Sequence, residues 1–283
     1  MSVDTAVPET ERTPGRAGRN LPAAIGVGVG LAALVLLSLF FYKPAFIAVE
    51  VIAIAIGVWE LSRSLGVKDL HVSLIPLLAG TVGMIVLAYQ RGPEDLVVAL
   101  LLTVLALVVW RLADGGPGYL PDVAVGAFVA VYVPFLAGFA ALMTAPSDGA
   151  RRTTIFIATT ACSDIGGYAA GVLFGKHPMA PSISPKKTWE GFAGSAVACT
   201  VVGIVLVTTL LHGAWWQGAC LGLALVCSAV LGDLTQSAIK RDLGIKDMGT
   251  LLPGHGGIME RLDSLLPSAP IAYLLLVTFV PPG

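Results

Sequence analysis

Residues 232–265 read GDLTQSAIKRDLGIKDMGTLLPGHGGIMERLDSL and are the most polar stretch of a chain that otherwise avoids charge. Over the whole sequence, hydrophobic residues make up 56% and charged residues only 12%. Soluble domains carry about 25% charged residues. Because no soluble core could hide this much apolar surface, we expect a membrane protein whose polar stretch lies at one face of the bilayer.

Apolar runs of spanning length follow one another along the rest of the chain, and a transmembrane helix needs about 20 residues. We predict an all-α polytopic membrane protein with about nine transmembrane helices, at residues 22–41, 44–62, 72–90, 94–113, 120–145, 152–174, 190–211, 215–232 and 266–280. Residues 1–20 are polar and mixed in charge, which predicts a disordered cytoplasmic tail. We divide the remainder into an N-terminal transmembrane scaffold, 21–150, and a C-terminal transmembrane catalytic region, 151–283.

The distribution of lysine and arginine predicts the orientation of these spans. With the N-terminus in the cytoplasm, thirteen of the 17 basic residues fall on inner segments. The outer segments hold the other four, Lys43, Arg91, Arg151 and Arg152. This bias puts residues 175–189 and 232–265 together at the cytoplasmic ends of the C-terminal helices. We therefore expect an integral protein of a bacterial plasma membrane, with its active site facing the cytoplasm.

The polar stretch has the residue types of a site for metal and phosphate. Asp233, Ser237 and Lys240 are spaced to share one helix face, and so are Glu260 and Asp263. Further cations and a Gly-rich turn supply positive charge and free backbone N–H groups; these are Arg241, Lys246, Arg261 and residues 253–257. A solvated loop is the bland alternative, but both signs of charge at helical spacing argue against it.

Three blocks of sequence carry this pattern. The first comprises Ser237, Lys240-Arg241, Lys246-Asp247, Pro253-Gly254-His255-Gly256-Gly257 and Glu260-Arg261-Leu262-Asp263. The second is Ser184-Pro185-Lys186-Lys187-Thr188-Trp189-Glu190-Gly191, and the third runs from Ser163-Asp164 through Gly167-Tyr168 and Gly171 to Phe174-Gly175-Lys176. Together, over roughly residues 155–280, they resemble the signature of the phosphatidate cytidylyltransferases, the CDP-diacylglycerol synthases. One position departs: the family has Asp where this chain has Glu260, whose carboxylate is one methylene further out.

The resemblance implies that CTP and phosphatidate react to give CDP-diacylglycerol and pyrophosphate, in phospholipid biosynthesis. The lipid phosphate is already anionic, so its attack on the α-phosphate of CTP needs positioning and charge neutralisation more than a general base. The residues expected to act in catalysis are Asp233, Ser237, Lys240, Arg241, Lys246, Asp247 and Arg261. Those expected to bind substrate phosphate are Lys186, Lys187, His255, Gly256 and Gly257.

Hard divalent ions held by oxygen ligands suit this chemistry. We expect Mg²⁺, as one ion or two, with Mn²⁺ able to substitute, and we leave a monovalent cation open. The expected ligands are Asp164, Asp233, Glu260 and Asp263. The partners are CTP, phosphatidate and the lipid bilayer, with no nucleic acid, and a homodimer remains open.

Two further carboxylates lie inside predicted spans, where ionisable residues are costly and often functional. We expect Glu60 to snorkel or to pair with Arg63, and Glu50 to cap its helix or to pair with Lys43. If these groups instead formed an ion path, the protein would be a transporter, but the charge gathers at one membrane face. A CTP-dependent polyprenol kinase is a second alternative. The four cysteines lie in apolar segments and read as fillers.

Overall fold

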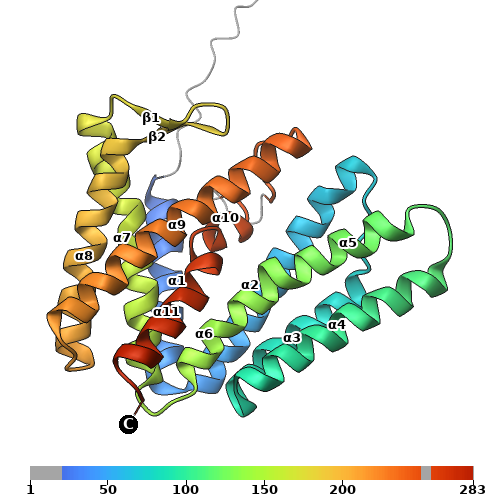
Figure 1. The fold of residues 1–283 in the computed structure, drawn as a ribbon, viewed down its shortest axis with the longest axis horizontal. Coiled ribbons are helices and arrows are strands. Elements are labelled where there is room, and N and C mark those ends of the chain that lie inside the picture. The colour runs from blue at the N-terminus through green and yellow to red at the C-terminus, as the bar shows by residue number, and fades with distance from the viewer. Residues whose placement is uncertain (1–20, 250–255, 283) are drawn as a thin grey trace, which may run out of the picture.

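The computed structural model describes residues 21–249 and 256–282 and is built almost entirely of long helices (Figure 1). The helices are α1 (Leu21–Phe41), α2 (Lys43–Leu65), α3 (Leu74–Arg91), α4 (Pro93–Asp114), α5 (Tyr119–Ala130), α6 (Leu136–Thr144), α7 (Gly149–Phe174), α8 (Trp189–Leu210), α9 (Trp215–Leu243), α10 (Met259–Leu262) and α11 (Leu265–Phe279). Short elements complete the fold: a 3₁₀ turn η1 (Gly66–Lys68), a π-helical turn η2 (Val131–Phe135), and strands β1 (Pro178–Ala180) and β2 (Ser184–Thr188).

Within the described ranges, eight helical segments are long and apolar enough to cross a bilayer. They correspond to the predicted spans from residue 43 onward, and α10 and α11 together form the last one. Helix α1 overlaps the first predicted span, but its apolar stretch Gly28–Phe41 is shorter than the others. The all-α membrane fold is confirmed, with eight candidate spans where about nine were expected. The predicted tail, residues 1–20, lies outside the described residues.

Helix α9 is longer than the predicted span at 215–232, because it continues to Leu243. Gly244 then adopts a positive φ of 70° and ends the helix, as glycine commonly does. The first third of the polar stretch is therefore helical. Asp233, Ser237 and Lys240 lie on this extension, at the spacing that the sequence predicted.

Helices α7, α8 and α9 approach one another closely because glycines face each other across their contacts. A Cβ added at Gly166 of α7 would lie 2.8 Å from the carbonyl oxygen of Gly194 on α8. A Cβ at Gly203 of α8 would lie 2.4 Å from the carbonyl oxygen of Gly218 on α9. Small residues at such contacts let helix backbones approach in a membrane. The three helices therefore form one tight unit, seen at the left of Figure 1.

A small antiparallel hairpin caps one end of this unit (Figure 1). Strands β1 and β2 pair Pro178 with Thr188 and Ala180 with Ser184. The sequence predicted only a loop here, since Pro185 and two lysines are poor strand formers. A hairpin in place of a loop fixes the direction from which Lys186 and Lys187 reach the helices.

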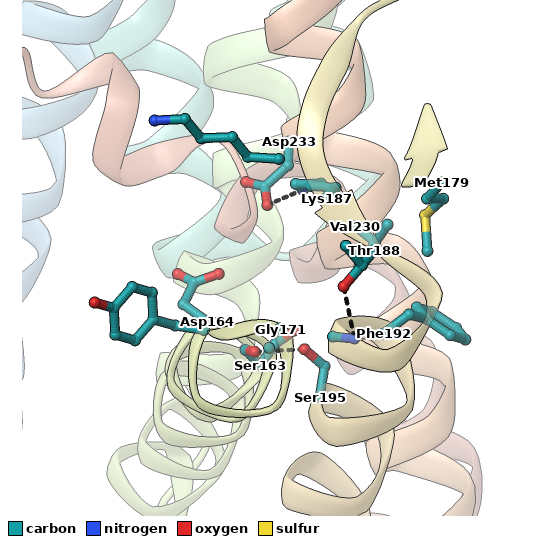
Figure 2. A pocket seen from close by; sticks show the side chains of 14 residues that line it. Ser163, Asp164, Gly171, Met179, Lys187, Thr188, Phe192, Ser195, Val230 and Asp233 are labelled. Atoms are coloured by element: carbon teal, nitrogen blue, oxygen red, sulfur yellow. Dashed lines mark hydrogen bonds and ion pairs between the residues drawn. The ribbon is translucent and has the colours of Figure 1, made fainter. Parts of the chain in front are cut away.

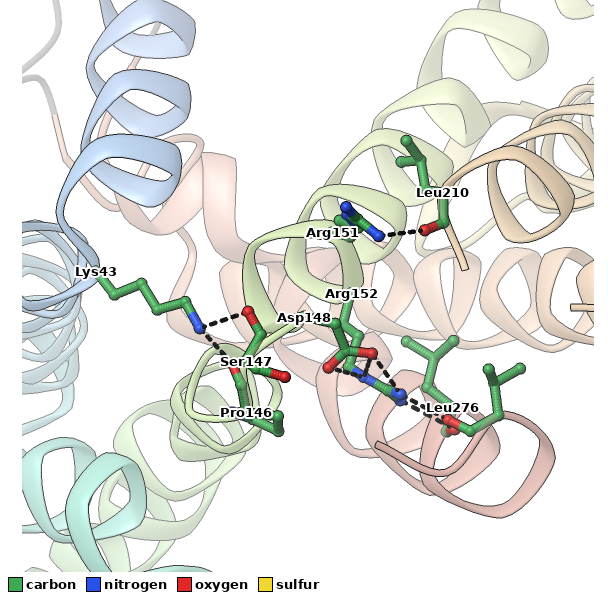
Figure 3. Close-up of polar contacts among 9 residues, drawn as sticks. Lys43, Pro146, Ser147, Asp148, Arg151, Arg152, Leu210 and Leu276 are labelled. Atoms are coloured by element: carbon green, nitrogen blue, oxygen red, sulfur yellow. Dashed lines mark hydrogen bonds and ion pairs between the residues drawn. The ribbon is translucent and has the colours of Figure 1, made fainter. Parts of the chain in front are cut away.

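The opposite end of the molecule is held by a polar cluster at the α6–α7 turn (Figure 3). Arg152, only 2% exposed, pairs with Asp148 at 2.8 Å and donates to the carbonyl oxygens of Leu276 and Val280 at 3.2 and 2.7 Å. Lys43 donates to the carbonyl oxygens of Pro146 and Ser147. Lys43 was expected as a partner for Glu50, so that expectation was wrong. The cluster ties the start of α7 to the end of α11.

Candidate active site

A pocket of about 210 Å³ lies where α7, α8, α9 and the hairpin meet (Figure 2). Its lining draws on two of the sequence blocks and on the polar stretch: Asp164 and Gly167 from the third block, Lys186, Lys187 and Gly191 from the second, and Asp233 from the start of residues 232–265. These segments are far apart in the sequence. Their convergence on one cavity is the observation that makes it the candidate active site.

The second block owes its shape to two side chains that bind backbone groups. Thr188 caps α8, because its hydroxyl accepts the N–H of Gly191 at 3.1 Å. Glu190, in the first turn of α8, accepts the N–H groups of Lys176 and His177 and contacts the His177 ring at 2.5 Å. Both ends of the hairpin are thereby held against α8, and β2 runs along the rim of the pocket.

Lys187 of β2 and Asp233 of α9 form an ion pair across this pocket (Figure 2). Both side chains are largely buried, with exposed fractions of 26% and 22%. A partly desolvated pair interacts more strongly than one at an open surface. The pair joins the hairpin to α9 at the floor of the site.

Three aspartates from three helical segments act on one another. Asp263, at the α10–α11 junction, lies within hydrogen-bonding reach of Asp233 and also interacts electrostatically with Asp164. Asp164 in turn interacts electrostatically with Asp233 and with the opposite charges of Lys187 and Arg261. Asp263 also accepts the N–H of Ser264 at 2.8 Å. The three carboxyl groups therefore gather their oxygen atoms beside the two cations.

The remaining predicted residues surround this centre at different depths. Arg241 is exposed and donates to the carbonyl oxygen of Ile183 in the hairpin turn at 3.3 Å. Ser237 is half-buried on α9, one turn beyond Asp233, and Lys240 is half-buried one turn further. Lys246 and Asp247 are exposed after the end of α9. His255 lies outside the described residues, and Gly256 has a positive φ of 79°.

Glu260 and Gly257 are hydrogen-bonded to each other in the structure. The carboxylate of Glu260 accepts the N–H of Met248 at 2.7 Å and the N–H of Gly257 at 2.9 Å, and lies 3.8 Å from the ammonium of Lys240. Glu260 was expected among the metal ligands and the Gly257 N–H was expected to bind phosphate. Both expectations stay predictions; in the structure Glu260 joins Met248 to Gly257 through their backbone N–H groups.

Two residues of the N-terminal half interact with the polar stretch: Tyr132, which the sequence analysis did not single out, and Glu60, which it named without this contact. The hydroxyl of Tyr132 in η2 is buried and interacts electrostatically with Asp263 and Asp233. The available signal was Pro134, because a proline inside a predicted span indicates an irregular turn, and π turns often occur at functional sites. Glu60 is buried and accepts the N–H of Met259 at 2.8 Å.

The expectations for the two intramembrane glutamates were wrong. Arg63 does not pair with Glu60 but lies over the Trp59 ring, 5.6 Å from its centre. Glu50 is also buried, and neither of its oxygens has a hydrogen-bond partner in the part of the chain that the structure describes. Only Glu60 is therefore connected to the polar stretch.

Comparison with known proteins agrees with the site. A model of the cytidylyltransferase family matches residues 22–279. The chain belongs to the cytidylyltransferase family. The phosphatidate cytidylyltransferase of Mycobacterium leprae (strain TN) is 43% identical over 94% of this chain and 90% of its own length. That of Mycobacterium bovis (strain ATCC BAA-935 / AF2122/97) is 42% identical over 95% and 92%.

A more distant relative matches a shorter part of the chain. The phosphatidate cytidylyltransferase of Brucella suis biovar 1 (strain 1330) is 37% identical over 153 residues, 52% of this chain and 57% of its own length. The match to the cytidylyltransferase family model is far longer and includes the helices that the sequence assigned to a scaffold. Membership of this family therefore involves the N-terminal half as well, in agreement with the positions of Tyr132 and Glu60.

Proposed function

We propose that this protein is a phosphatidate cytidylyltransferase, which transfers the cytidylyl group of CTP to phosphatidate and releases pyrophosphate. The convergence of two sequence blocks and Asp233 of the polar stretch on one pocket carries the proposal. The names of the relatives with 42–43% identity over nearly the whole chain support it. A pocket with carboxylates and lysines fits a reaction between two polyanions.

The reaction joins a phosphate oxygen of the lipid to the α-phosphorus of CTP and breaks the bond between the α-phosphorus and the oxygen that bridges to the β-phosphate. The attacking oxygen is anionic at neutral pH, so no side chain has to remove a proton. The work of the protein is to hold two anions together and to offset charge on the transferred and leaving groups. We assign this work to Lys186 and Lys187 from the hairpin and to Lys240 and Arg261 from the polar stretch.

Lys187 has a second task, because it already neutralises Asp233. A lysine ammonium is a compact charge on a flexible stem, so it can serve a carboxylate and a phosphate in turn. Arg241 and Lys246 are more exposed than Lys240 and lie further along the chain from Asp233. We assign them to the outer end of the triphosphate.

The carboxylates fit a hard cation by their chemistry. Asp164, Asp233 and Asp263 offer oxygen donors only, and they repel one another unless positive charge is added. Within residues 21–249 and 256–282, no group of three or more metal-ligating side chains is already arranged as a binding site. We propose these three aspartates, without Glu260, as the residues that would hold Mg²⁺. Bound there, Mg²⁺ would supply charge neutralisation for the phosphates.

The membrane setting follows from the apolar helices and the distribution of basic residues. We place the pocket at the cytoplasmic face of a bacterial plasma membrane, where CTP is present and the lipid phosphate sits at headgroup level. Helix α7 offers exposed apolar side chains beside the pocket, including Ile165, Tyr168 and Val172. Such a surface lets a lipid approach sideways without leaving the bilayer.

The proposal is tested with purified protein in detergent, labelled CTP, phosphatidate and Mg²⁺. The expected products are CDP-diacylglycerol and pyrophosphate in equal amounts. Release of CDP with a phosphorylated lipid would instead identify a CTP-dependent kinase. Absence of any turnover of CTP with phosphatidate would overturn the proposal.

A further inference from the structure

The polar segment between α9 and α10 is connected to the N-terminal half through one buried carboxylate. Glu60 lies on α2 and is only 1% exposed. Its Oε2 accepts the N–H of Met259, the first residue of α10, at 2.8 Å. A buried carboxylate is costly unless it makes specific bonds. Because Glu60 bonds a backbone N–H of the polar stretch, we infer that it has a role in arranging that stretch.

Two glycines, one near each end of the segment, pack directly against this carboxylate. A Cβ added at Gly249 would lie 2.0 Å from Glu60 Oε1, and a Cβ added at Gly257 would lie 2.5 Å from Glu60 Oε2. Ser64, one turn further along α2, donates to the carbonyl oxygen of Met248 at 3.2 Å. The two ends of the segment thus meet on the same face of α2.

Glu260 holds the same segment from within. It accepts the N–H groups of Met248 and Gly257, and its carboxylate lies 3.8 Å from the ammonium of Lys240. Glu60 and Glu260 both border Gly257. The anchor on α2 is therefore connected to a lysine of the site through one intervening side chain.

We propose that Glu60 is a positioning residue, which fixes the segment that follows α9 and so sets the places of Lys240 and Arg261. This inference rests on the proposed function and assigns Lys240 and Arg261, among the cations that hold the two anions, to the triphosphate of CTP. Glu60 does not touch the pocket lined by α7, the hairpin and α8. Its loss is expected to weaken the use of CTP while leaving the use of phosphatidate nearly unchanged.

The test compares Glu60→Ala, Glu60→Gln and a matched control in the purified full chain. Glu50→Ala is the control, because Glu50 is a buried carboxylate on the same helix with no hydrogen-bond partner among the described residues. Glu60→Ala should raise the KM for CTP by about tenfold, the factor expected for one lost buried hydrogen bond. The KM for phosphatidate should stay within about twofold. Glu60→Gln should keep a KM for CTP close to the wild-type value, since its amide oxygen still accepts the N–H of Met259.

Hydrogen–deuterium exchange gives a readout that needs no activity. Exchange at Met248, Gly257 and Met259 should be faster in Glu60→Ala than in the wild type and in Glu50→Ala. Unchanged exchange at these amides would refute the positioning role of Glu60 even if the wild type proved inactive. An inactive wild type with the expected exchange would overturn the proposed function alone.

The kinetic outcomes separate positioning from general stability. Equal effects of Glu60→Ala and Glu50→Ala on the KM for CTP would overturn the proposal, and so would an equal rise in both KM values. If Glu60→Ala does not fold, Gly249→Ala tests the same contact from the other side. It should raise the KM for CTP in the same way, and a wild-type KM would overturn the proposal.

Discussion

The ammonium of Lys187 on β2 pairs with the carboxylate of Asp233 on α9, so two distant sequence motifs meet through opposite charges. The pair has two consequences. It draws the hairpin onto the helices, and it keeps a cation beside the aspartate cluster. Lys187 should therefore matter both for binding substrate and for the arrangement of Asp233.

A double-mutant cycle tests this coupling. Lys187→Met and Asp233→Asn should each reduce kcat/KM by about 10²-fold, the scale of a lost electrostatic contact to a transition state. The double variant should be little worse than Asp233→Asn alone, because both changes disrupt one unit. Lys68→Met, at an exposed lysine of η1, is the control and should retain wild-type activity. Strictly additive losses would show that the two residues act independently.

The metal assignment gives a prediction that separates the carboxylates. Activity should require Mg²⁺ or Mn²⁺ and should be lost with a chelator. Asp233→Asn and Asp263→Asn should raise the Mg²⁺ concentration needed for half-maximal rate. Glu260→Gln should leave it unchanged, because Glu260 accepts backbone N–H groups. A shifted Mg²⁺ titration for Glu260→Gln would return this residue to the ligand set.

The Asp148–Arg152 pair predicts a stability effect without an effect on chemistry. Arg152 is 2% exposed, and its loss would remove a side-chain donor from the carbonyl oxygens of Leu276 and Val280. Arg152→Met should lower the unfolding free energy by about 3 kcal/mol, as expected when one partner of a buried ion pair is removed. The neighbouring Arg151→Met, at an exposed site, should change it by less than about 0.5 kcal/mol. Thermal unfolding in detergent measures both.

The same pair predicts a pH dependence of known sign. The hydrogen bond from Arg152 holds the pKa of Asp148 below its ordinary value. A carboxyl whose pKa is lowered in the folded state contributes stability above its unfolded pKa and loses it as the pH falls through the folded value. The wild type should therefore be more stable than Asp148→Asn at neutral pH, and the difference should vanish in acid. A difference that grows in acid would contradict the assignment.

Close packing of α7 against α8 predicts that Gly166 accepts no larger side chain. A Cβ at this position would lie 2.7 Å from the Cβ of Ala198 and 2.8 Å from a backbone oxygen, so Gly166→Ala should force the helices apart. Both stability and activity should fall, because these helices form two walls of the pocket. Gly83→Ala on α3, where a Cβ meets nothing within 4 Å, is the matched control. Equal thermal midpoints for the two variants would argue against the close contact.

The fold could be read from the sequence because its strongest signal is long apolar runs. Most spans were located to within a few residues, but the one predicted to end at Gly232 continues to Leu243. Hairpin β1–β2 was not predicted because its residues have low strand propensity. Its pairing depends instead on Glu190 and Thr188, which hold it against α8. Tertiary contacts decided that segment.

The residues of the site could be predicted from the sequence only in part. Asp164, Lys187 and Asp233 share one pocket, as the motif blocks suggested. The orientation of Glu260 could not be read from spacing, since a carboxylate three residues before Asp263 can face the same way or turn to nearby N–H groups. The role of Glu60 depended on contact with residues almost 200 positions away, and one sequence contains no sign of such a pairing.

The order of elements around the pocket has a consequence for biosynthesis in the cell. The walls come from consecutive helices, α7 to α9, so they can assemble while the ribosome is still adding residues. Asp263 lies beyond them at the α10–α11 junction and reaches Asp233 only when the last span, formed by α10 and α11, enters the membrane. A nascent chain that stalls before α10 therefore holds a cavity with lysines and two aspartates but lacks the third carboxylate. If the third carboxylate is needed to hold Mg²⁺, as proposed, we expect unfinished copies of the protein to consume no CTP.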